Sequence, residues 1–588
     1  YPKMDWTEVQ CVPVSGGPHY PASGTSLGNN NTSVASSIGD LSSATGSFDS
    51  VTGLTSETDS ISGVDRFSLQ LNTNFFPVSL CNFDFCGWLQ FVFGSFGCTD
   101  NNNPPTDCVY IEYWLRDWAL SPTNPCPSGW MPFTDNTDVQ IRTHCIHEVA
   151  GTPFTPHLPI TSLKSMSLTG SLQVNSTSDP TQNNIFLTFG AGGEMGAAME
   201  TDFLDVGANF YWTEAEFNVF GQDQASEAKF NPGTTLVVRT QIQDRLFGNV
   251  LPTCHHYIGF TRETNNLNVV ERPTITKAPL PSIAFKESNV PSAVPPDCAT
   301  SLGDTHLMTF DGLFYDFQAE GEFLLAQPAP DFVVQTQQVS GAPNWPNAAI
   351  NKAVGLKMGK SQVAICLDPF RLEIDGKRVR LDKGKSVSLP GDVILLRRGD
   401  TYFIARPGGD VVRADVNNNE YIDVSVGHAP GTAVSGLLGN ANGATGDDIA
   451  MQAGATLTQP VSFTDLYGRY ADSWRVKPNA SLLCKGQKIE TGKPGAPIYA
   501  SNLTQSQYNS ALAVCTAAGV KDPTLLEACI LDVTVIGNNN AANVFAGLTP
   551  PVSVMRVQIA GSVPAGGIGA PPGVTQPGGT PLQVPKSV

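Results

Sequence analysis

Charged residues are scarce in this sequence, because Asp, Glu, Lys and Arg make up only 15% of its 588 residues. Basic residues are the scarcer kind: 34 Lys and Arg stand against 53 Asp and Glu, which gives a net charge of -19. A chain with this balance is repelled by phosphate backbones and by anionic lipid surfaces. The composition therefore argues against nucleic acid as a partner.

Long hydrophobic runs are also missing, since no apolar stretch reaches the roughly 18 to 20 residues of a membrane span. The cysteines lack the doubled CxxC spacing of zinc ribbons, and there is no Walker-type phosphate loop. The 13 cysteines instead predict disulfides, with at least one thiol free or paired between chains. Because the chain starts at Tyr1 without Met or a signal peptide, we expect a processed, exported protein or a piece of one, secreted or at the cell surface.

Turn-forming and hydrophobic residues are plentiful, with 56 Gly, 44 Pro and a hydrophobic content of 41%. This composition is typical of strands joined by frequent turns, so we expect a mainly β protein of several domains. The expected parts are a Ser/Thr/Gly/Asn-rich arm or linker (1–62), a disulfide-bonded, jelly-roll-like β-sandwich (63–270), a Pro-rich linker (271–297), a second β-sandwich (298–476), a connector (477–501), a helical hairpin (502–546) and a Pro/Gly-rich tail (547–588).

The predicted arm and linker depend on composition alone. Residues 1–62 carry almost no charge and little apolar surface, which indicates a flexible segment. Alternatively, the arm pairs with a neighbouring molecule, because it has no charges that oppose strand addition. The proline density of residues 271–297 predicts a semi-extended connector without a central strand.

Local signals predict two hairpins of different kinds. Asp375-Gly376 suits a two-residue turn between short strands over residues 372–381. Residues 504–518 have helical spacing and stop at Gly519, and a second helix starts at Asp522-Pro523. Cys515 and Cys529 are placed to join these two helices.

Three motifs carry a family resemblance: residues 303–326 read GDTHLMTFDGLFYDFQAEGEFLLA, residues 435–448 read SGLLGNANGATGDD, and residues 463–476 read FTDLYGRYADSWRV. In this order they resemble the opening, the Gly-rich loop and the closing strand of a von Willebrand factor type D domain. The resemblance covers residues 298–476 and implies a β-sandwich there. The helical hairpin resembles a reduced version of the cysteine-rich module that often follows this domain, and the N-terminal sandwich resembles no family that we name.

The Gly-rich loop has the composition of a calcium site. Asn440, Asn442, Asp447 and Asp448 supply neutral and anionic oxygens between glycines that let the backbone curl. By resemblance to the family, Asp311 would close the site from the first segment. The alternative is a polar turn held by Asx hydrogen bonds without a metal.

The sequence departs from the family at functional positions. Some members cleave themselves at an Asp-Pro bond, but Thr305 follows Asp304 here, so we expect no self-cleavage. Leu438 and Gly321 stand where the family usually has cysteines, so multimerisation through those cysteines is not implied. Cys298, Cys366 and Cys484 form an odd trio that predicts a spare thiol.

Several residues could support other functions. Gln90, Glu112, Glu214 and Glu216 lie on predicted strands, where a Glu-Gln pair would suit a glutamic peptidase and a carboxylate pair a glycosidase. Exposed carboxylates between aromatics are the simpler interpretation. Other motifs have simpler interpretations. The cysteines among His144, Cys145 and His147 and in the segment 254–256 are more simply disulfide halves. The Arg398-Gly399-Asp400 tripeptide is more simply a turn, and the Gly-x-Ser-x-Gly match at 24–28 is low-complexity sequence.

These observations favour an extracellular structural or adhesive protein: a surface, matrix or filament subunit with a calcium-stabilised domain. The expected partners are further copies of the chain, another extracellular protein or a glycan. Asparagines in glycosylation sequons would make it a glycoprotein; they are Asn30, Asn31, Asn175, Asn479 and Asn502. The alternatives are a secreted hydrolase, glutamic-peptidase-like or a glycosidase, with its site in the N-terminal sandwich, and a carbohydrate-binding module.

Overall fold

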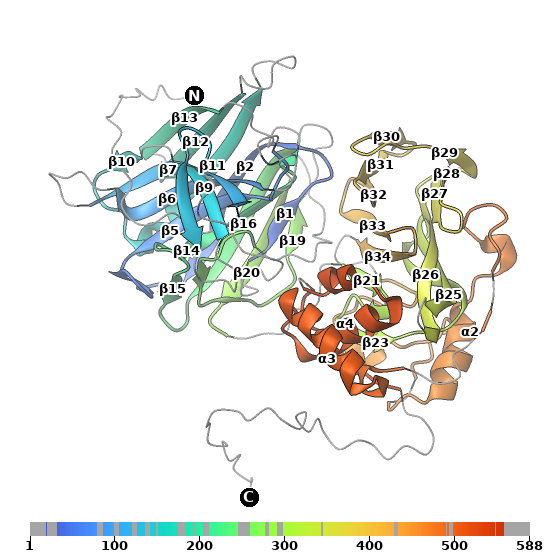
Figure 1. Cartoon of the computed structure of the whole chain (residues 1–588). Helices are drawn as coiled ribbons and strands as arrows, with labels where there is room; N and C mark the ends of the chain where they lie inside the picture. Colours follow the sequence, from blue (N-terminus) through green and yellow to red (C-terminus); the bar gives the residue numbers. More distant parts are fainter. Residues whose placement is uncertain are drawn as a thin grey trace, which may run out of the picture.

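A computed structural model describes most of the chain, in the ranges 19, 32–78, 81, 86–98, 105–119, 126–135, 142–148, 151–174, 183–192, 195–203, 211–244, 259–276, 281–290, 298–342, 345–428, 433–457, 459–489, 491–492, 498–546 and 548–557. The chain is mainly β, as the sequence predicts, and its strands form two lobes (Figure 1).

The first lobe is a sandwich of two large antiparallel sheets. One has the order β1 (Val34–Ser36), β14 (Glu214–Gly221), β5 (Phe67–Thr73), β6 (Gly87–Cys98), β7 (Thr106–Ala119), β9 (Arg142–Glu148) and β8 (Met131–Asp135), with β10 (Thr152–Phe154) on β7. The other has the order β13 (Met195–Phe203), β12 (Asn183–Ala191), β11 (Met166–Val174), β2 (Leu41–Thr52), β16 (Thr235–Asp244), β20 (Ser282–Ser288) and β18 (Asn268–Val269), with β19 (Thr274–Thr276) on β20.

A small sheet and a short helix are also described in this lobe. The sheet runs β17 (Thr264–Asn265), β15 (Glu227–Phe230), β3 (Glu57–Asp59) and β4 (Gly63–Val64), and the 3-10 helix η2 spans Ile160–Ser165. Aromatic side chains from both large sheets meet in the core. The rings of Phe93 and Phe189 stack with centroids 4.5 Å apart, and those of Phe48 and Phe217 lie 5.4 Å apart.

The predicted arm over residues 1–62 is wrong for its second half. Strand β2 lies inside a large sheet, paired with β11 on one side and β16 on the other. Leu41, Ala44 and Phe48 are buried. The small residues have a packing role that composition hides, because a side chain at Gly46 would overlap the Phe217 ring of the opposite sheet. The first part of the predicted arm lies outside the described residues, apart from His19.

The predicted linker over residues 271–297 is also wrong in part. It contains β19 and β20, and β20 pairs with β16 over its whole length. Ile283 and Phe285 are buried in the sandwich core. Proline disfavours only the positions that it occupies, and here Pro281 stands at the strand's start, where its carbonyl still accepts a hydrogen bond from the Ile242 amide.

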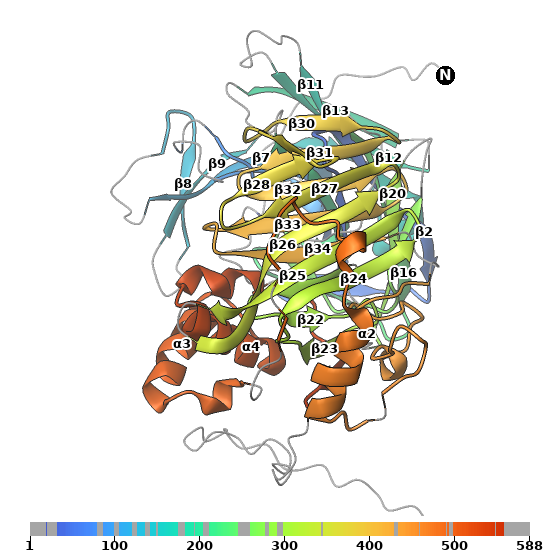
Figure 2. The ribbon, with the colours of Figure 1, turned by 90° about the vertical axis from the view of Figure 1, so that its right-hand side faces the viewer.

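The second lobe packs two further sheets around one core. A nine-stranded sheet has the order β30 (Ser386–Leu389), β31 (Val393–Arg398), β32 (Thr401–Arg406), β33 (Asp410–Asn417), β34 (Tyr421–Gly427), β21 (Ala299–Leu302), β22 (His306–Met308), β23 (Leu313–Asp316) and β35 (Ser553–Met555). A six-stranded sheet runs β24 (Gly321–Ala329), β25 (Phe332–Ala342), β26 (Trp345–Met358), β27 (Ser361–Cys366), β28 (Arg371–Ile374) and β29 (Lys377–Val379). Figure 2 shows β24 to β28 side by side.

Local predictions in this lobe have mixed outcomes. The hairpin of β28 and β29 is confirmed, and Asp375 and Gly376 both have the positive φ of its turn. Residues 553–555 of the predicted tail form β35, which pairs parallel to β23. The closing motif is helical where a strand was expected, with a π-helix η5 (Asp465–Tyr470) running into α2 (Ala471–Trp474).

The other helices within the described residues are η4 (Thr445–Asp447), η6 (Pro478–Ala480), η7 (Ala500–Asn502), α3 (Gln505–Ala517), α4 (Pro523–Ile536) and η8 (Asn539–Val544). The predicted helical hairpin is confirmed: Thr504 and Asp522 cap α3 and α4, and the Cys515–Cys529 disulfide joins them. None of the described helices has the length and hydrophobicity needed to cross a bilayer.

Disulfides fix both lobes. The first contains Cys81–Cys86, Cys98–Cys108 and Cys126–Cys145. In the second, Cys366–Cys484 ties β27 to the connector that follows the sandwich. The expected spare thiol of the trio is not Cys298, because this residue is also disulfide-bonded.

The two lobes touch at the end of β31. The Arg398 guanidinium donates to the Ile38 carbonyl of the first lobe at 2.8 Å, and Leu396 packs with Ile38 and Cys298. Asp400 pairs instead with Lys383 and Arg397. Arg398-Gly399-Asp400 is therefore part of a turn and a lobe contact, in line with the simpler interpretation of this tripeptide.

We expect Gly46→Ala to destabilise the first lobe by about 1–3 kcal/mol, because the added methyl group must displace the Phe217 ring. Calorimetry of the intact chain measures this as a lower melting temperature. Gly468→Ala is the control, since a side chain there meets nothing within 4 Å. Equal melting temperatures for Gly46→Ala and the wild type would show that the sandwich has space at this point.

The buried carboxyl group of Glu287 should make the stability of the protein depend on pH. Burial raises the pKa of Glu287 from 4.5 to about 8, against hydrogen bonds from Asn218 and Asn265. Because the pKa in the folded state lies above the unfolded value, the protonated carboxyl group makes its full contribution to stability below the unfolded pKa. This contribution is lost as the pH rises through about 8. Glu287→Gln keeps the shape without the charge, so it should gain stability over the wild type at pH 9, by on the order of a few kcal/mol.

Urea unfolding of both proteins at about pH 5 and pH 9 measures this difference. Glu227→Gln, at a half-exposed position in the same lobe, is the control and should show no such change. A constant difference between Glu287→Gln and wild type at both pH values would contradict the prediction.

Candidate functional site

The opening segment and the Gly-rich loop lie side by side, although more than a hundred residues separate them. The Phe310 amide donates to the Leu438 carbonyl at 3.1 Å, and the Leu438 amide donates to Leu325 at 3.0 Å. The Tyr315 hydroxyl reaches the Leu437 carbonyl at 2.6 Å. At Gly436, which has a positive φ, a side chain would strike the Leu325 backbone. The contact between the two segments is therefore made largely by their main chains, and the Tyr315 hydroxyl adds a side-chain hydrogen bond.

Asp311 and Asp448 are the buried acidic groups of this junction. The Asp311 carboxylate accepts from the amides of Asn442 at 3.0 Å and Gly443 at 2.9 Å. The Asp448 carboxylate accepts from the Thr309 hydroxyl at 2.6 Å and the Asn440 amide at 3.2 Å. The predicted residue of the first segment thus contacts the predicted loop.

The other predicted residues continue the same network. Asn440 Oδ1 accepts from the Asn442 amide at 3.1 Å, and the Asn442 side chain donates to Asp447 Oδ2 at 2.9 Å. Asp447 Oδ1 is buried and has no hydrogen-bond partner. The structure therefore gathers Asp311, Asn440, Asn442, Asp447 and Asp448 where the opening segment meets the Gly-rich loop, and hydrogen bonds already satisfy most of their oxygens.

The charges of this loop are not balanced within it. Burial raises the pKa of Asp448 to about 7, and the charge of the neighbouring Asp311 raises it further. A divalent cation would relieve this repulsion between the carboxylates and could use the orphaned Asp447 oxygen. Hard oxygen donors of mixed charge are the ligands that calcium prefers.

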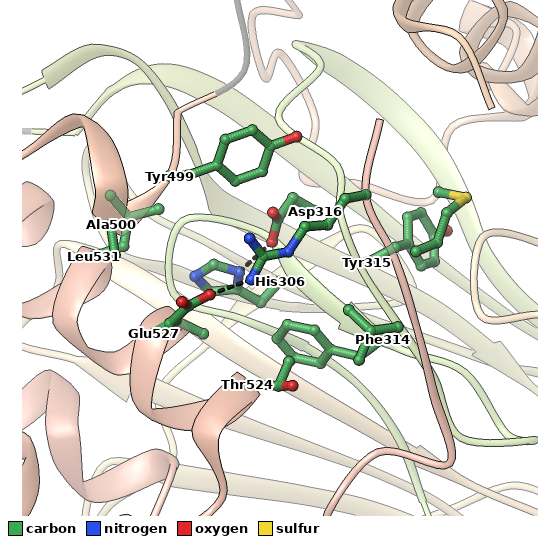
Figure 3. A pocket seen from close by; sticks show the side chains of 13 residues that line it. His306, Phe314, Tyr315, Asp316, Tyr499, Ala500, Thr524, Glu527 and Leu531 are labelled. Carbon is green, nitrogen blue, oxygen red and sulfur yellow. Dashed lines mark hydrogen bonds and ion pairs between the residues drawn. The ribbon is translucent and has the colours of Figure 1, made fainter. Parts of the chain in front are cut away.

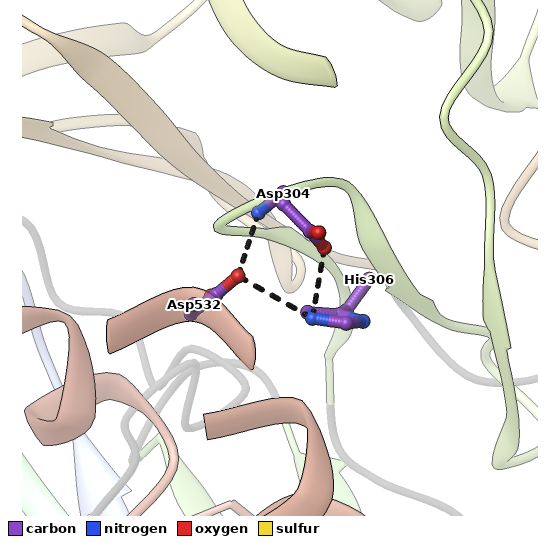
Figure 4. Close-up of side chains that lie close together, drawn as sticks. All are labelled: Asp304, His306 and Asp532. Carbon is purple, nitrogen blue, oxygen red and sulfur yellow. Dashed lines mark hydrogen bonds and ion pairs between the residues drawn. The ribbon is translucent and has the colours of Figure 1, made fainter. Parts of the chain in front are cut away.

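A second buried cluster joins this lobe to the helical hairpin, and sequence reasoning missed it. Asp304 and His306 lie between β21 and β23, and Asp532 points toward them from α4 (Figure 4). In the described part of the chain, these residues alone bring three carboxylate, imidazole or thiol ligand atoms within 4.8 Å of one another. In the sequence, the Gly-Asp-Thr-His segment indicates only the absence of self-cleavage, and no local signal pairs it with a helix more than two hundred residues away.

A small pocket lies beside this cluster and is lined by both His306 and Asp316 (Figure 3). It is lined by residues of β22, β23, β35 and the helices, including Phe314, Asp316 and Tyr499. The ion pair of Glu527 and Arg556 spans it.

In the first lobe, three of the four candidate catalytic residues form one buried polar row. Glu216 lies opposite Asn72, Asn72 opposite Gln90, and Gln90 opposite Glu112, on four neighbouring strands. Three strand spacings place the backbones of Glu216 and Glu112 roughly 14 Å apart. The side-chain amides of Asn72 and Gln90 stand between the two carboxylates, with Asn72 bonded to Glu216 and Gln90 to Glu112. Glu214 accepts from Ser36 instead.

These carboxylates are buried and hydrogen-bonded within the fold. The Glu112 carboxylate accepts from the His19 backbone amide at 3.2 Å and from the Trp114 indole at 3.1 Å. With the Gln90 side-chain amide turned so that its nitrogen faces Glu112, the carboxylate also accepts from Gln90 at 2.9 Å. Glu216 accepts from Asn72 and the Phe260 amide. They were expected on the solvent face, and that expectation is wrong. Cys145 is a disulfide half, and residues 24–28 and 254–256 lie outside the described residues.

The comparisons with known proteins concern the second lobe. The family model of the von Willebrand factor type D domain matches residues 298–455. Hemocytin of Bombyx mori is 28% identical over 187 residues, which cover 30% of this chain and 5% of hemocytin. Sushi domain-containing protein 2 of Homo sapiens is 26% identical over 202 residues, which cover 32% of this chain and 24% of that protein.

The chain thus spans less than a quarter of the length of either relative. The family match begins at Cys298, includes the opening segment and the Gly-rich loop, and ends before the helical closing motif. It agrees with the two sheets and the shared core found over the same residues. The chain therefore contains a von Willebrand factor type D domain at residues 298–455.

Proposed function

We propose that this chain is an extracellular structural or adhesive protein, a subunit of a surface, matrix or filament, whose von Willebrand factor type D domain is stabilised by calcium. The family match at residues 298–455 carries the proposal. The disulfides of both lobes support an oxidising compartment. The acidic composition supports a protein that remains soluble among divalent cations.

Calcium is proposed to bind where the opening segment meets the Gly-rich loop. Asp311 and Asp448 would supply the buried charge, with Asp447 and the amide oxygens of Asn440 and Asn442 around them. Bound calcium would supply positive charge that offsets the repulsion between the carboxylates. The protein's own contribution is to hold the loop against residues 310–325 through main-chain hydrogen bonds.

The proposed partners are other copies of the chain, another extracellular protein or a glycan. Two sequons, Asn479 and Asn502, lie at exposed positions where a glycan could be attached. Ile61 and Val64 are 65% and 71% exposed beside the edge strand β4, which offers apolar surface and unpaired backbone for self-association.

We expect millimolar calcium to raise the melting temperature of the second lobe and chelation to lower it, because only the folded loop brings these oxygens together. Asp311→Asn and Asp448→Asn should abolish the calcium-dependent shift. Asp382→Asn, at an exposed surface ion pair, is the matched control and should keep it.

Calorimetry with calcium, with magnesium and with chelator makes this comparison. The same melting temperature in all three conditions would indicate that the loop is an Asx-bonded turn. A shift that survives Asp311→Asn and Asp448→Asn together would place the calcium elsewhere.

A structural role predicts assembly that depends on concentration. Analytical ultracentrifugation of the intact chain, with electron microscopy of the same samples, should show oligomers or filaments that weaken when Ile61 and Val64 are both replaced by Lys. Ser60→Lys, on the neighbouring turn, is the control for added charge. A single monomeric species at all concentrations would contradict self-association and favour a different partner.

A glutamic-peptidase-like hydrolase is the second candidate, favoured by the contact between Gln90 and Glu112. Both residues are buried beneath His19, so a substrate could reach them only if this cover moved. Hydrolysis of an unfolded protein substrate by the wild type, and its loss in Gln90→Ala, would support this candidate against a purely structural role.

A further inference from the structure

The cluster of Asp304, His306 and Asp532 is buried between two modules. Asp304 and Asp532 are 0% exposed and His306 is 2% exposed. Asp304 follows β21, His306 begins β22, and Asp532 lies on α4 of the helical hairpin (Figure 4). Asp304 and His306 belong to the opening motif, but Asp532 lies outside every motif of the type D domain resemblance, and the three residues are separate from the Gly-rich loop.

The ligand atoms converge without forming ordinary hydrogen bonds. His306 Nε2 lies 2.9 Å from Asp304 Oδ1 and 3.4 Å from Asp532 Oδ1. Nevertheless, His306 Nε2, Asp304 Oδ1 and Asp532 Oδ2 have no hydrogen-bond partner of acceptable geometry. His306 Nε2 and Asp304 Oδ1 thus face each other at ion-pair distance, while Asp532 Oδ1 already accepts from the Asp304 amide and Asp532 Oδ2 is a further buried oxygen without a partner. Buried polar atoms left in this state are costly unless a further group satisfies them.

The separations are those of ligands around a small cation. With ligand bonds of about 2.0–2.2 Å, neighbouring donor atoms in tetrahedral or octahedral coordination stand roughly 2.8–3.6 Å apart. The two distances from His306 Nε2 fall within this span. An imidazole nitrogen with two carboxylate oxygens is a donor set that suits zinc and neighbouring transition metals.

Each of the three residues is oriented by a further contact. Asp316 Oδ1 lies 2.6 Å from His306 Nδ1, which would place the proton on Nδ1 and leave the Nε2 lone pair facing the cluster. Gln318 donates to Asp304 Oδ2 at 3.0 Å, and the Asp304 amide donates to Asp532 Oδ1 at 3.0 Å. Such supporting contacts are characteristic of metal centres.

The surrounding residues allow α4 to approach closely and place aromatic rings against His306. A side chain at Gly303, which has a positive φ, would overlap the Asp532 carboxylate, so glycine permits the approach of α4. The ring of Phe314 stacks on His306 at 5.7 Å, and Phe545 meets it edge-on at 5.9 Å. The neighbouring pocket is lined by His306, Glu527 and Arg556 but by neither Asp304 nor Asp532.

We propose that Asp304, His306 and Asp532 bind one divalent transition metal, zinc by preference, which fastens the helical hairpin to the type D domain. The cluster has two carboxylates and one neutral imidazole as ligands, so a divalent ion balances its charge. A fourth ligand position is left for water or for the second oxygen of a carboxylate. This site differs in chemistry from the proposed calcium loop, which has oxygen donors only.

The test uses the full chain, freed of metal by chelation and titrated with zinc in the presence of excess calcium. Competition with a chromophoric chelator gives the affinity, elemental analysis gives the stoichiometry, and cobalt in place of zinc gives a visible spectrum that reports the donor set. We expect one zinc per chain and a higher melting temperature for the helical hairpin.

His306→Ala and Asp532→Asn should lose this binding, and Gln318→Ala should weaken it by about 10–100-fold because it removes only a supporting contact. Asp382→Asn is the control and should bind zinc like the wild type. Circular dichroism of each variant against the metal-free wild type shows whether it folds. No zinc or cobalt binding by the wild type, or equal binding by folded His306→Ala, would overturn the proposal and leave an imidazolium held among carboxylates.

Discussion

Main-chain hydrogen bonds between residues 310–327 and 434–440 are the constraint on which the second lobe depends. They join the edge of the six-stranded sheet to the Gly-rich loop, and the same contact seats Tyr315 against Leu437. Glycine is needed at Gly436, where any side chain would meet the Leu325 backbone. Because the backbones approach so closely, the side chains of Asp311 and Asp448 are brought together in a buried position. The proposed calcium site is therefore a consequence of how the two sheets close.

The type D domain and the helical hairpin act as one unit for a similar reason. Strand β35 returns from the end of the hairpin and pairs with β23, while Asp532 on α4 reaches the turn that contains Asp304. Buried polar groups need partners, so this docking would be unfavourable without an ion or a proton to balance the carboxylates. Two sites with different donors, one facing the loop and one facing the helices, would stabilise the lobe at two separate places.

The sequence predicts correctly the features that depend on neighbouring residues. It misleads where a segment is assigned from its composition alone. Asp375-Gly376 and the caps Thr504 and Asp522 depend on their immediate neighbours, so the hairpins were predicted correctly. The Ser- and Gly-rich composition of β2 predicts an arm, because nothing local in the sequence shows that Gly46 faces Phe217. The candidate calcium residues were found through their motif, whereas the Asp304, His306 and Asp532 cluster depends on a helix that only the tertiary fold places there.

The central claim is that the junction of the opening segment and the Gly-rich loop holds calcium in a rigid, non-catalytic domain. Anomalous diffraction from crystals of the intact chain grown with calcium tests it most directly, because it locates the ion and its ligands together. The account predicts an anomalous peak in contact with the carboxylates of Asp311 and Asp448. Clear density for this loop in calcium-grown crystals, with no peak there and both carboxylates bonded only to backbone amides and Thr309, would contradict it.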